Sequence, residues 1–580
     1  MDAQTALPDL SYYRPTAPAP SPRVIEADVC IYGGTSAAVA AAVQLRRMGR
    51  TAVIAEFGRH IGGLTAGGLG ATDIGNKAAI GGISRDFYRR LGRYYADRKI
   101  AIPTRGQQKV EGDAAKWDSG PEEAWVFEPS AAAKVFADLL ADAQAQVHYE
   151  QHLLAVRKDR GRIRQIEMAD GTIYRATVFI DATYEGDLMA MAGVTYHVGR
   201  EANAVYDETL NGVHFGHPNH NFTRFVDPYV VPGDPASGLL KGIFPGDGGR
   251  QGDGDHRVQA YNFRMCLTQR PDIRVAFPKP TGYDPARYEL LLRYVLAGVH
   301  DSLNLTVMMP NGKTDTNNYG AFSSDNIGMN YAWPDGVVAA RSDASVGPAV
   351  PAVSGRKAGV RTAAMLAHAM PPLDLYALRE RIFQDHVNYQ AGLYWFLAND
   401  PRVPQAVRDH VSSYGLAADE FTATSHWPHQ LYVREARRMI SQVVMTEHHC
   451  VGRFVAEDPV GLAAYTMDSH NCNRVVRGGR AMNEGNVEVG RFPPYPISWR
   501  SIVPRQRECA NLLVPVCLSA SHIAYGSIRM EPVFMILGQS AATAAAMAIE
   551  HKCAVQQVDY PTLRAKLLAD GQVLEWKRSA

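Results

Sequence analysis

The sequence is poor in cysteine, and the cysteines that it has are scattered. Only 7 of its 580 residues are Cys, and no two of them form a C-x-x-C pair. Disulfide frameworks and zinc knuckles both need a regular pattern of cysteines. Neither is indicated, and we expect most of these thiols to lie in the core.

The chain also lacks net charge and long apolar runs. Its 60 Lys and Arg nearly cancel its 59 Asp and Glu, which argues against a broad nucleic-acid or polyanion surface. No apolar run approaches the ~18 residues of a membrane span, and the N-terminus lacks the pattern of a signal peptide. We expect a soluble protein with a small-molecule substrate, no nucleic-acid partner and no membrane span; the oligomeric state is left open.

The first 23 residues are rich in Ala and Pro, with prolines at positions 15, 18, 20 and 22. This composition predicts an extended leader rather than a packed element. It fits either the mature N-terminus of an exported, periplasmic protein or a tail of a cytoplasmic one.

The most informative stretch, residues 28–56, reads as strand, turn, helix and second strand. Residues 29–32 are an apolar run typical of a buried parallel strand. Gly33 and Gly34 allow a sharp turn whose backbone can approach a pyrophosphate. The Ala-rich stretch that follows predicts a thin helix with its free N–H groups at the phosphates, ended by Gly49.

An acidic residue closes the second strand of this unit. Glu56 follows Gly33 by 23 residues, near the ~20-residue spacing at which a carboxylate meets a ribose hydroxyl. Thr35 and Ala38 replace the second and third glycines of the G-x-G-x-x-G fingerprint. The register of the whole unit nevertheless predicts a nucleotide site.

The rest of the first 200 residues favours FAD over NAD. Helices are expected at 84–95 and 129–144, after a glycine-rich loop at 60–70. A β-meander follows, with strands at 153–156, 163–168 and 173–176 and a buried strand at 178–180. A plain NAD fold would have another βαβ unit here, so the meander indicates an FAD-type domain.

The later chain predicts an α/β fold with a discontinuous cofactor domain. Residues 201–500 contain no second phosphate loop and are rich in polar and aromatic types that suit a pocket. The last part returns to a buried strand at 511–517, a turn at 526–527 and an Ala-rich helix at 538–550. We expect a leader (1–23), a Rossmann-type three-layer ββα FAD domain (24–200 and 501–580) and an α+β substrate or cap domain (201–500).

These pieces together resemble the FAD-dependent oxidoreductases often labelled xanthan-lyase-like, which are related in fold to glutathione-reductase-type and fumarate-reductase-type flavoproteins. The resemblance covers roughly residues 27–575. The segments that carry it are Tyr32-Gly-Gly-Thr-Ser-Ala37, Gly62-Gly-Leu-Thr-Ala-Gly-Gly-Leu-Gly70, Ile180-Asp-Ala-Thr-Tyr-Glu-Gly-Asp187, Asp468-Ser-His470 and Tyr525-Gly-Ser-Ile-Arg-Met-Glu-Pro-Val-Phe534.

The resemblance implies FAD, held non-covalently, along the first domain. It places the phosphate turn at the pyrophosphate, Glu56 at the adenosine ribose, the 181–187 turn beside the ribityl chain and the 529–533 segment near the flavin ring. The implied cofactor residues are Gly33, Gly34, Thr35, Ser36, Ala37, Glu56, Gly62, Gly63, Leu64, Thr65, Leu154, Ala182, Thr183, Asp187, Met530, Glu531, Pro532 and Val533. Some relatives attach flavin covalently near the position of His60, but we do not expect a covalent link here.

Three residues are candidates for the chemistry. Oxidation of an alcohol needs a base for the hydroxyl proton, and His522, just before the segment expected at the flavin, is the first candidate. The alternative role is a cap between strand and helix. His470 has a carboxylate two residues away and either orients substrate hydroxyls or belongs to an ordinary loop. Arg529 either stabilises reduced flavin or pairs with Glu531.

Aromatic and polar residues between 425 and 434 suit a sugar ring. The expected substrate residues are Trp427, His429, Tyr432, Arg434 and Tyr525. A second polar cluster, at 317–330, is expected to be loop structure. His448, His449 and Cys450 suggest a metal site, but neighbours on a strand point to opposite faces, so no metal is predicted.

The prediction is an FAD-dependent oxidoreductase that oxidises a CH–OH group of a sugar, glycoside or similar molecule by hydride transfer to flavin N5, with an unidentified electron acceptor. The alternative is an FAD-dependent enzyme acting on a C–C or C=C bond of a carboxylic acid, which would want an arginine cluster such as Arg434, Arg437 and Arg438. A non-enzymatic flavin-binding protein is the third possibility.

Overall fold

A mostly parallel sheet forms the centre of the first domain. The computed structural model describes residues 7, 10–19, 21–103, 122–301, 303, 305–333, 335 and 372–576. In the sheet, β1 (Val24–Tyr32) pairs in parallel with β2 (Ala52–Ala55) and with β6 (Ile173–Asp181), and β3 (Gln146–His148) extends the sheet beyond β2. This confirms the mixed α/β class with a parallel sheet.

The β-meander lies at the other edge. Strands β4 (Leu153–Asp159) and β5 (Arg162–Met168) are antiparallel, and β5 pairs with β6. The expected strands at 173–176 and 178–180 are one continuous strand, because β6 pairs with β1 along almost its whole length. The far end of β6 pairs with β20 (Leu512–Leu513), so residues from the C-terminal region return to the first sheet.

The two faces of the sheet bury different sets of side chains. Val29 and Ile31 face a core shared with helices α1 (Ser36–Arg47), α3 (Gly82–Asp97), α4 (Pro129–Ala143) and α13 (Glu531–Glu550). Cys30 and Tyr32 face a second core, which contains residues of β4, β5 and α5 (Asp187–Met191). This alternation follows from the two-residue period of a strand.

Helices α1 and α13 pack against each other at close range. A Cβ atom on Gly538 would lie 2.2 Å from the carbonyl oxygen of Ala37. The Ala-rich sequences of both helices therefore allow their backbones to approach. The helix α13 begins at Glu531, seven residues before the expected start, and Gly526 and Ser527 lie inside α12 (His522–Ile528) rather than in a turn.

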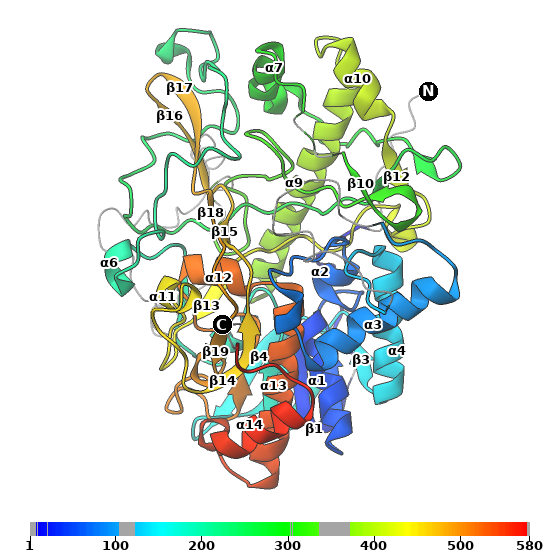
Figure 1. Cartoon of the computed structure of the whole chain (residues 1–580), viewed down its shortest axis with the longest axis vertical. Coiled ribbons are helices and arrows are strands. Elements are labelled where there is room, and N and C mark those ends of the chain that lie inside the picture. Colours follow the sequence, from blue (N-terminus) through cyan, green and yellow to red (C-terminus); the bar gives the residue numbers. More distant parts are fainter. Residues whose placement is uncertain are drawn as a thin grey trace.

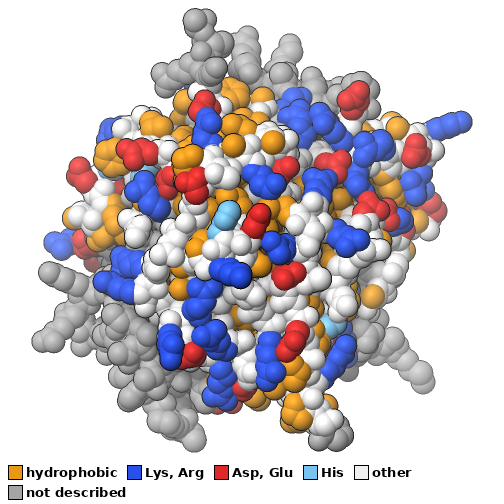
Figure 2. All heavy atoms as spheres, turned by 90° about the horizontal axis from the view of Figure 1, so that it is seen from below, with side chains coloured by type: hydrophobic (Ala, Val, Ile, Leu, Met, Phe, Trp, Pro, Cys, Tyr) orange, Lys and Arg blue, Asp and Glu red, His pale blue; other side chains and the backbone are white. Residues whose placement is uncertain are grey.

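Among the described residues, α13 is the one helix long and apolar enough to span a membrane, and 94% of its apolar window is buried inside the protein. It is a core helix. On the surface, Lys and Arg side chains alternate with Asp and Glu across the face shown in Figure 2, as the balanced composition suggests.

Much of the chain between the two parts of the sheet lies above the sheet in Figure 1, but residues 437–463 and 495–498 lie in the lower half of the view. The long helix α9 (Pro372–Asn399) runs from the upper part toward the sheet.

The remaining α-helices of the described residues are α2 (Gly63–Ala66), α6 (Asn203–Tyr206), α7 (Glu289–Leu296), α10 (Gln405–Ser412), α11 (Glu447–Cys450) and α14 (Tyr560–Ala569). The remaining strands are β7 (Tyr196–Val198), β8 (Leu267–Thr268), β9 (Arg274–Val275), β10 (Val307–Met309), β11 (Lys313–Thr314), β12 (Gly415–Ala417), β13 (Arg437–Met439), β14 (Pro459–Ala463), β15 (Met467–Ser469), β16 (Asn473–Arg477), β17 (Arg480–Glu484), β18 (Val487–Val489) and β19 (Tyr495–Ser498).

Two local expectations were wrong. Residues 10–13 of the expected leader are packed into the protein, with Leu10 only 3% exposed. His448, His449 and Cys450 lie on helix α11 rather than on a strand. No group of three potential metal ligands occurs anywhere in the described part of the chain.

Candidate active site

The phosphate turn joins β1 to α1 in a conformation that favours glycine. Gly33 has φ +94°, and a Cβ there would lie 2.6 Å from Thr183 Cγ2. Thr35 begins the helix without a side-chain cap, because its hydroxyl donates instead to the carbonyl of Ala182 at 2.7 Å. The first N–H groups of an α-helix have no partner within the helix. They are therefore available to a phosphate group.

Glu56 braces this turn. Its carboxylate accepts hydrogen bonds from the backbone N–H of Gly34 and, at 2.5 Å, from that of Gly58. Burial raises its pKa to about 7, against the lowering effect of these two bonds. The carboxylate thus lies beside the phosphate turn, where the resemblance places the adenosine ribose.

The glycine-rich loop closes over the turn. Gly62 and Gly63 both have positive φ, and a Cβ on Gly63 would lie 3.2 Å from Thr35 Cα. The hydroxyl of Tyr184 accepts a bond from Leu64 N–H at 2.9 Å. The resulting groove is lined by Gly34, Thr35, Glu56, Phe57, His60, Gly63, Thr183, Tyr184, Glu185 and Gln430.

One residue in this groove has an unsatisfied carboxyl group. Glu185 is 1% exposed, and neither of its side-chain oxygens has a hydrogen-bond partner among the described residues. Burial raises its pKa to about 8, although Arg379 opposes the shift. A buried polar group without a partner is costly, so this site is suited to a ligand that offers hydroxyl or amide donors. FAD offers both along its ribose, ribityl and ring groups, so its donors match the unpartnered carboxyl group of Glu185.

Asp187 is held by two arginines. Its carboxylate lies 2.6 Å from Arg379 and 2.7 Å from Arg437. Burial alone would raise its pKa, but the two guanidinium groups outweigh that effect and hold the pKa at about 2. Asp187, the last residue of the 181–187 turn, is thus ionised, and its ion pair with Arg379 joins α5 to α9.

The start of α13 reaches the groove through Glu531. Its carboxyl group accepts bonds from Thr65 Oγ1 and Tyr184 OH, both at 2.6 Å. Glu531 therefore joins the glycine-rich loop to the C-terminal helix, and the expected pair between Arg529 and Glu531 does not form. Arg529 caps α12 and Glu531 begins α13, so the two side chains do not share the face of an extended strand.

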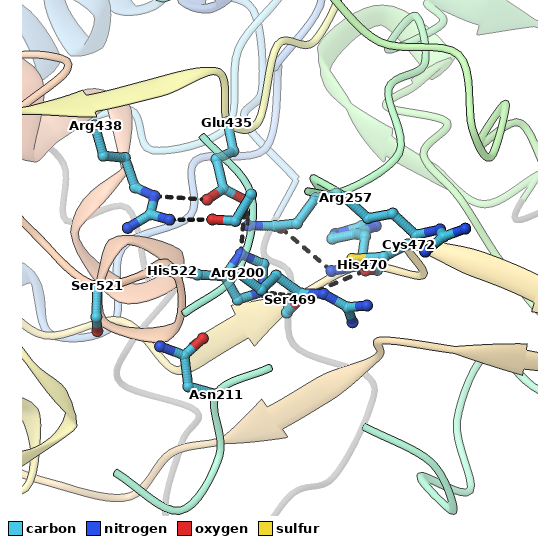
Figure 3. Close-up of polar contacts among 12 residues, drawn as sticks. Arg200, Asn211, Arg257, Glu435, Arg438, Ser469, His470, Cys472, Ser521 and His522 are labelled. Atoms are coloured by element: carbon cyan, nitrogen blue, oxygen red, sulfur yellow. Dashed lines mark hydrogen bonds and ion pairs between the residues drawn. The ribbon is translucent and has the colours of Figure 1, made fainter. Parts of the chain in front are cut away.

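A chain of hydrogen bonds centres on His522, the first residue of α12 (Figure 3). Its Nδ1 lies 2.7 Å from Glu435 Oε2, and its Nε2 lies 3.0 Å from Ser469 Oγ. All three side chains are buried. Glu435 is itself fixed by Arg438 at 2.7 Å, so the imidazole is held in one orientation.

A second histidine lies beside this chain. His470 Nδ1 is 2.9 Å from Asp325 and its Nε2 is 3.4 Å from Asp468. Asp468 also pairs with Arg529 at 3.0 Å, and Arg529 donates to Tyr432 OH at 2.9 Å. The structure therefore brings all three predicted catalytic residues into one region of buried polar contacts.

The family comparison covers nearly the whole chain. A model of the FAD dependent oxidoreductase family matches residues 28–567. The chain belongs to the FAD dependent oxidoreductase family. Its cofactor is therefore FAD, and the protein is an oxidoreductase.

Some solved structures are more distantly similar to this chain. A 3-ketosteroid dehydrogenase from Rhodococcus jostii RHA1 is 15% identical over 29% of this chain and 50% of its own, with a TM-score of 0.19. An L-amino acid deaminase from Proteus vulgaris is 13% identical over 32% of this chain and 54% of its own, with a TM-score of 0.22. An L-proline dehydrogenase from P. horikoshii is 14% identical over 32% of this chain and 26% of its own, with a TM-score of 0.17. The matches thus span about half or less of these relatives. No curated protein sequence gives a significant match.

Several residues expected in the oxidoreductase's site lie elsewhere. Leu154 is 39% exposed, because the alternation of β4 turns it outward and buries Leu153 instead. Trp427 is fully buried against Phe263, with ring centroids 5.7 Å apart, so its ring offers no open face to a sugar. Tyr525 is also buried, and its hydroxyl donates to the carbonyl of Val516 at 3.2 Å.

The other predicted substrate residues divide between two places. Tyr432 and Arg434 lie with the His470 network, where Arg434 pairs with Asp325 at 2.9 Å. His429 instead stacks on His60, with ring centroids 3.8 Å apart, next to the cofactor groove. Burial lowers the pKa of His60 to about 4 and that of His429 well below its usual value. Both rings are therefore neutral at pH 7.

Sequence reasoning missed four residues that now matter: Glu185, Gln430, Glu435 and Ser469. Each lies within two residues of a predicted site residue. The local pattern identified the right segments, but it gave no signal for which side chain in a segment points into the site.

Proposed function

We propose that this oxidoreductase oxidises a CH–OH group of a sugar, a glycoside or a similar polyhydroxylated small molecule. The observation that carries the proposal is the Glu435–His522–Ser469 chain. Bound FAD supplies the hydride acceptor, N5 of the flavin. The protein must then remove the hydroxyl proton, and the chain provides a route for it.

Glu435 sets the proton-accepting atom of His522. A carboxylate 2.7 Å from Nδ1 keeps a proton on that nitrogen and leaves Nε2 as an acceptor. The imidazolium that forms when Nε2 takes a proton is stabilised by the same carboxylate.

In this proposal Ser469, which is buried in the structure, relays the proton from the substrate to His522. Its hydroxyl oxygen is 3.0 Å from Nε2, so the substrate proton passes to Ser469 Oγ as the Ser469 proton passes to Nε2. With FAD bound, the substrate carbon would give up a hydride and the alcohol would become a carbonyl. Atoms and charge balance, with the released proton on His522.

The paired state of the arginines supports an uncharged substrate. The alternative substrate, a carboxylic acid, needs guanidinium groups that are free to bind it. Here Arg434 pairs with Asp325, Arg437 with Asp187, and Arg438 with Glu201. Each of the three is already paired with a carboxylate of the protein, although Arg437 shares Asp187 with Arg379.

The substrate class is tested by anaerobic mixing of the holoenzyme with monosaccharides, glycosides and dicarboxylates while flavin absorbance is followed. We expect bleaching by one or more polyhydroxylated compounds. Bleaching by carboxylic acids alone would overturn the proposal and favour the alternative.

The base is tested with the substrate that this panel identifies. His522→Ala should retain FAD and slow flavin reduction by about 10²–10⁴-fold, the usual effect of removing a general base. The exposed His551→Ala is the matched control and should react like the wild type. If flavin reduction in His522→Ala is as fast as in the wild type, His522 is a helix cap and not the base.

A further inference from the structure

The segment Leu10 to Tyr13 is built into the protein beside the cofactor groove, although its sequence reads as a leader. Leu10 and Tyr13 are 3% and 9% exposed. This burial is unusual for a Pro- and Ala-rich stretch, since that composition is typical of an extended segment rather than a packed one.

Helix α9 ties the segment down. The backbone N–H groups of Tyr12 and Tyr13 both donate to Glu380 Oε2 at 2.7 Å. Gln384 donates to the carbonyl of Leu10 at 2.8 Å and to Glu380 Oε1 at 2.8 Å. Glu380 and Gln384, one turn apart on α9, thus hold the backbone of the segment at Leu10, Tyr12 and Tyr13.

The Tyr12 ring then reaches the loop that follows Glu56. Its centroid lies 5.3 Å from that of Phe57 and 4.9 Å from that of Tyr331. Its hydroxyl lies 3.3 Å from Arg379, the partner of Asp187. Tyr12 therefore contacts residues that lie close to Glu56, the residue that braces the phosphate turn.

A pocket lies between this segment and the Glu56 loop. Its lining includes Leu10, Ser11 and Tyr12 together with residues 56–60. Glu56, Phe57, His60 and Gln430 also line the cofactor groove, so the two spaces share these walls and are neighbours.

We propose that residues 10–13 are part of the FAD site and close it over the adenosine half of the cofactor, with Tyr12 as an adenine-contacting ring. The pocket lies on the Glu56 side of the phosphate turn, where an acidic residue at the end of the second strand marks the ribose. Adenine is a flat aromatic group, and stacking of a base on an aromatic side chain contributes about 1–3 kcal/mol.

The test measures FAD release from the holoenzyme, followed by the rise of flavin fluorescence after dilution. Tyr12→Ala should release FAD about 5- to 150-fold faster, the range that corresponds to such a stacking contact. Tyr12→Phe keeps the ring and should release FAD almost as slowly as the wild type. Glu380→Ala, which frees the segment from α9, should act in the same direction as Tyr12→Ala. The exposed Tyr319→Ala is the control.

A second measurement separates a cofactor contact from a purely structural one. FAD raises the unfolding temperature of the protein, and the rise is larger when the folded state binds FAD more tightly. Tyr12→Ala should reduce the difference in unfolding temperature between the holoenzyme and the flavin-free protein. An equal fall of both temperatures, or unchanged FAD release in both Tyr12→Ala and Glu380→Ala, would overturn the proposal. Neither readout uses a substrate, so both are independent of the proposed reaction.

Discussion

Glu435 and His522 are 87 residues apart in the chain, yet a carboxylate oxygen of the first lies 2.7 Å from Nδ1 of the second. The pair is buried, and Arg438 holds the other oxygen of Glu435 at 2.7 Å. Burial alone would raise the pKa of Glu435, but His522 and Arg438 outweigh it and lower the pKa. The carboxylate is therefore charged and able to orient the imidazole.

Glu435→Gln should retain FAD and slow flavin reduction by about 10²–10⁴-fold. The amide can donate to Nδ1, which would move the ring proton to Nε2 and remove the acceptor that faces Ser469. Rapid-mixing measurement of flavin reduction checks this outcome. The half-buried Glu167→Gln is a control of the same chemistry on β5, and equal rates for the two variants would contradict the assigned role of Glu435.

Arg379→Met should lower the stability of the protein by about 3–5 kcal/mol, the usual cost of leaving one member of a buried ion pair without its partner. Both Arg379 and Asp187 are buried, although Arg437 partly compensates for the loss. Thermal unfolding measures the effect. Arg157→Met breaks an exposed pair with Glu167 and should hardly change the unfolding temperature. If both variants unfold like the wild type, the buried pair is not a structural anchor.

Glu185→Gln should remove part of the pH dependence of stability in the flavin-free protein. The pKa of Glu185 is raised to about 8 in the folded protein, so the folded state binds a proton that the unfolded chain loses near pH 4.5. Stability that is fully present below pH 4.5 is then lost as the pH rises through 8. Glu56, with a pKa of about 7, contributes a second decline in the same direction.

The unfolding temperature measured from pH 4 to 9 tests this assignment. The wild type should lose stability toward pH 9, and Glu185→Gln should lose less, while the decline due to Glu56 remains. A profile for Glu185→Gln that is parallel to that of the wild type would show that Glu185 does not titrate in this range.

Gly538→Ala should destabilise the protein, although alanine favours helices by about 1 kcal/mol over glycine. The added Cβ would lie 2.2 Å from the carbonyl oxygen of Ala37 in α1, and such overpacking costs about 1–3 kcal/mol. Glu550→Ala, at the exposed end of the same helix, should have little effect. A rise in the unfolding temperature of Gly538→Ala would mean that α1 and α13 can move apart freely.

Local patterns in the sequence were sufficient for the cofactor domain. The strand, turn and helix around Gly33, the position of Glu56 and the meander all depend on neighbours within about 30 residues. Hydrophobic period and glycine conformation determine them, and the structure has them at the expected places.

The same patterns were insufficient for the side chains expected at the substrate. Trp427 and Tyr525 have the chemistry of pocket residues, but both are buried in the core. Composition gives the type of a side chain and not its exposure, which depends on what other segments pack against it. The leader was misread for the same reason, because its partner Glu380 lies 368 residues from Tyr12.

The sequence by itself determined the family, the cofactor and the parallel sheet of this protein. The phosphate turn can be recognised because the residues that form it lie close together in the sequence. Only the tertiary structure decided which groups meet at His522. Ser469 is at the end of β15, Glu435 precedes β13 and His522 begins α12. Their hydrogen bonds exist only when three distant segments pack together, and no periodicity along the chain records that packing.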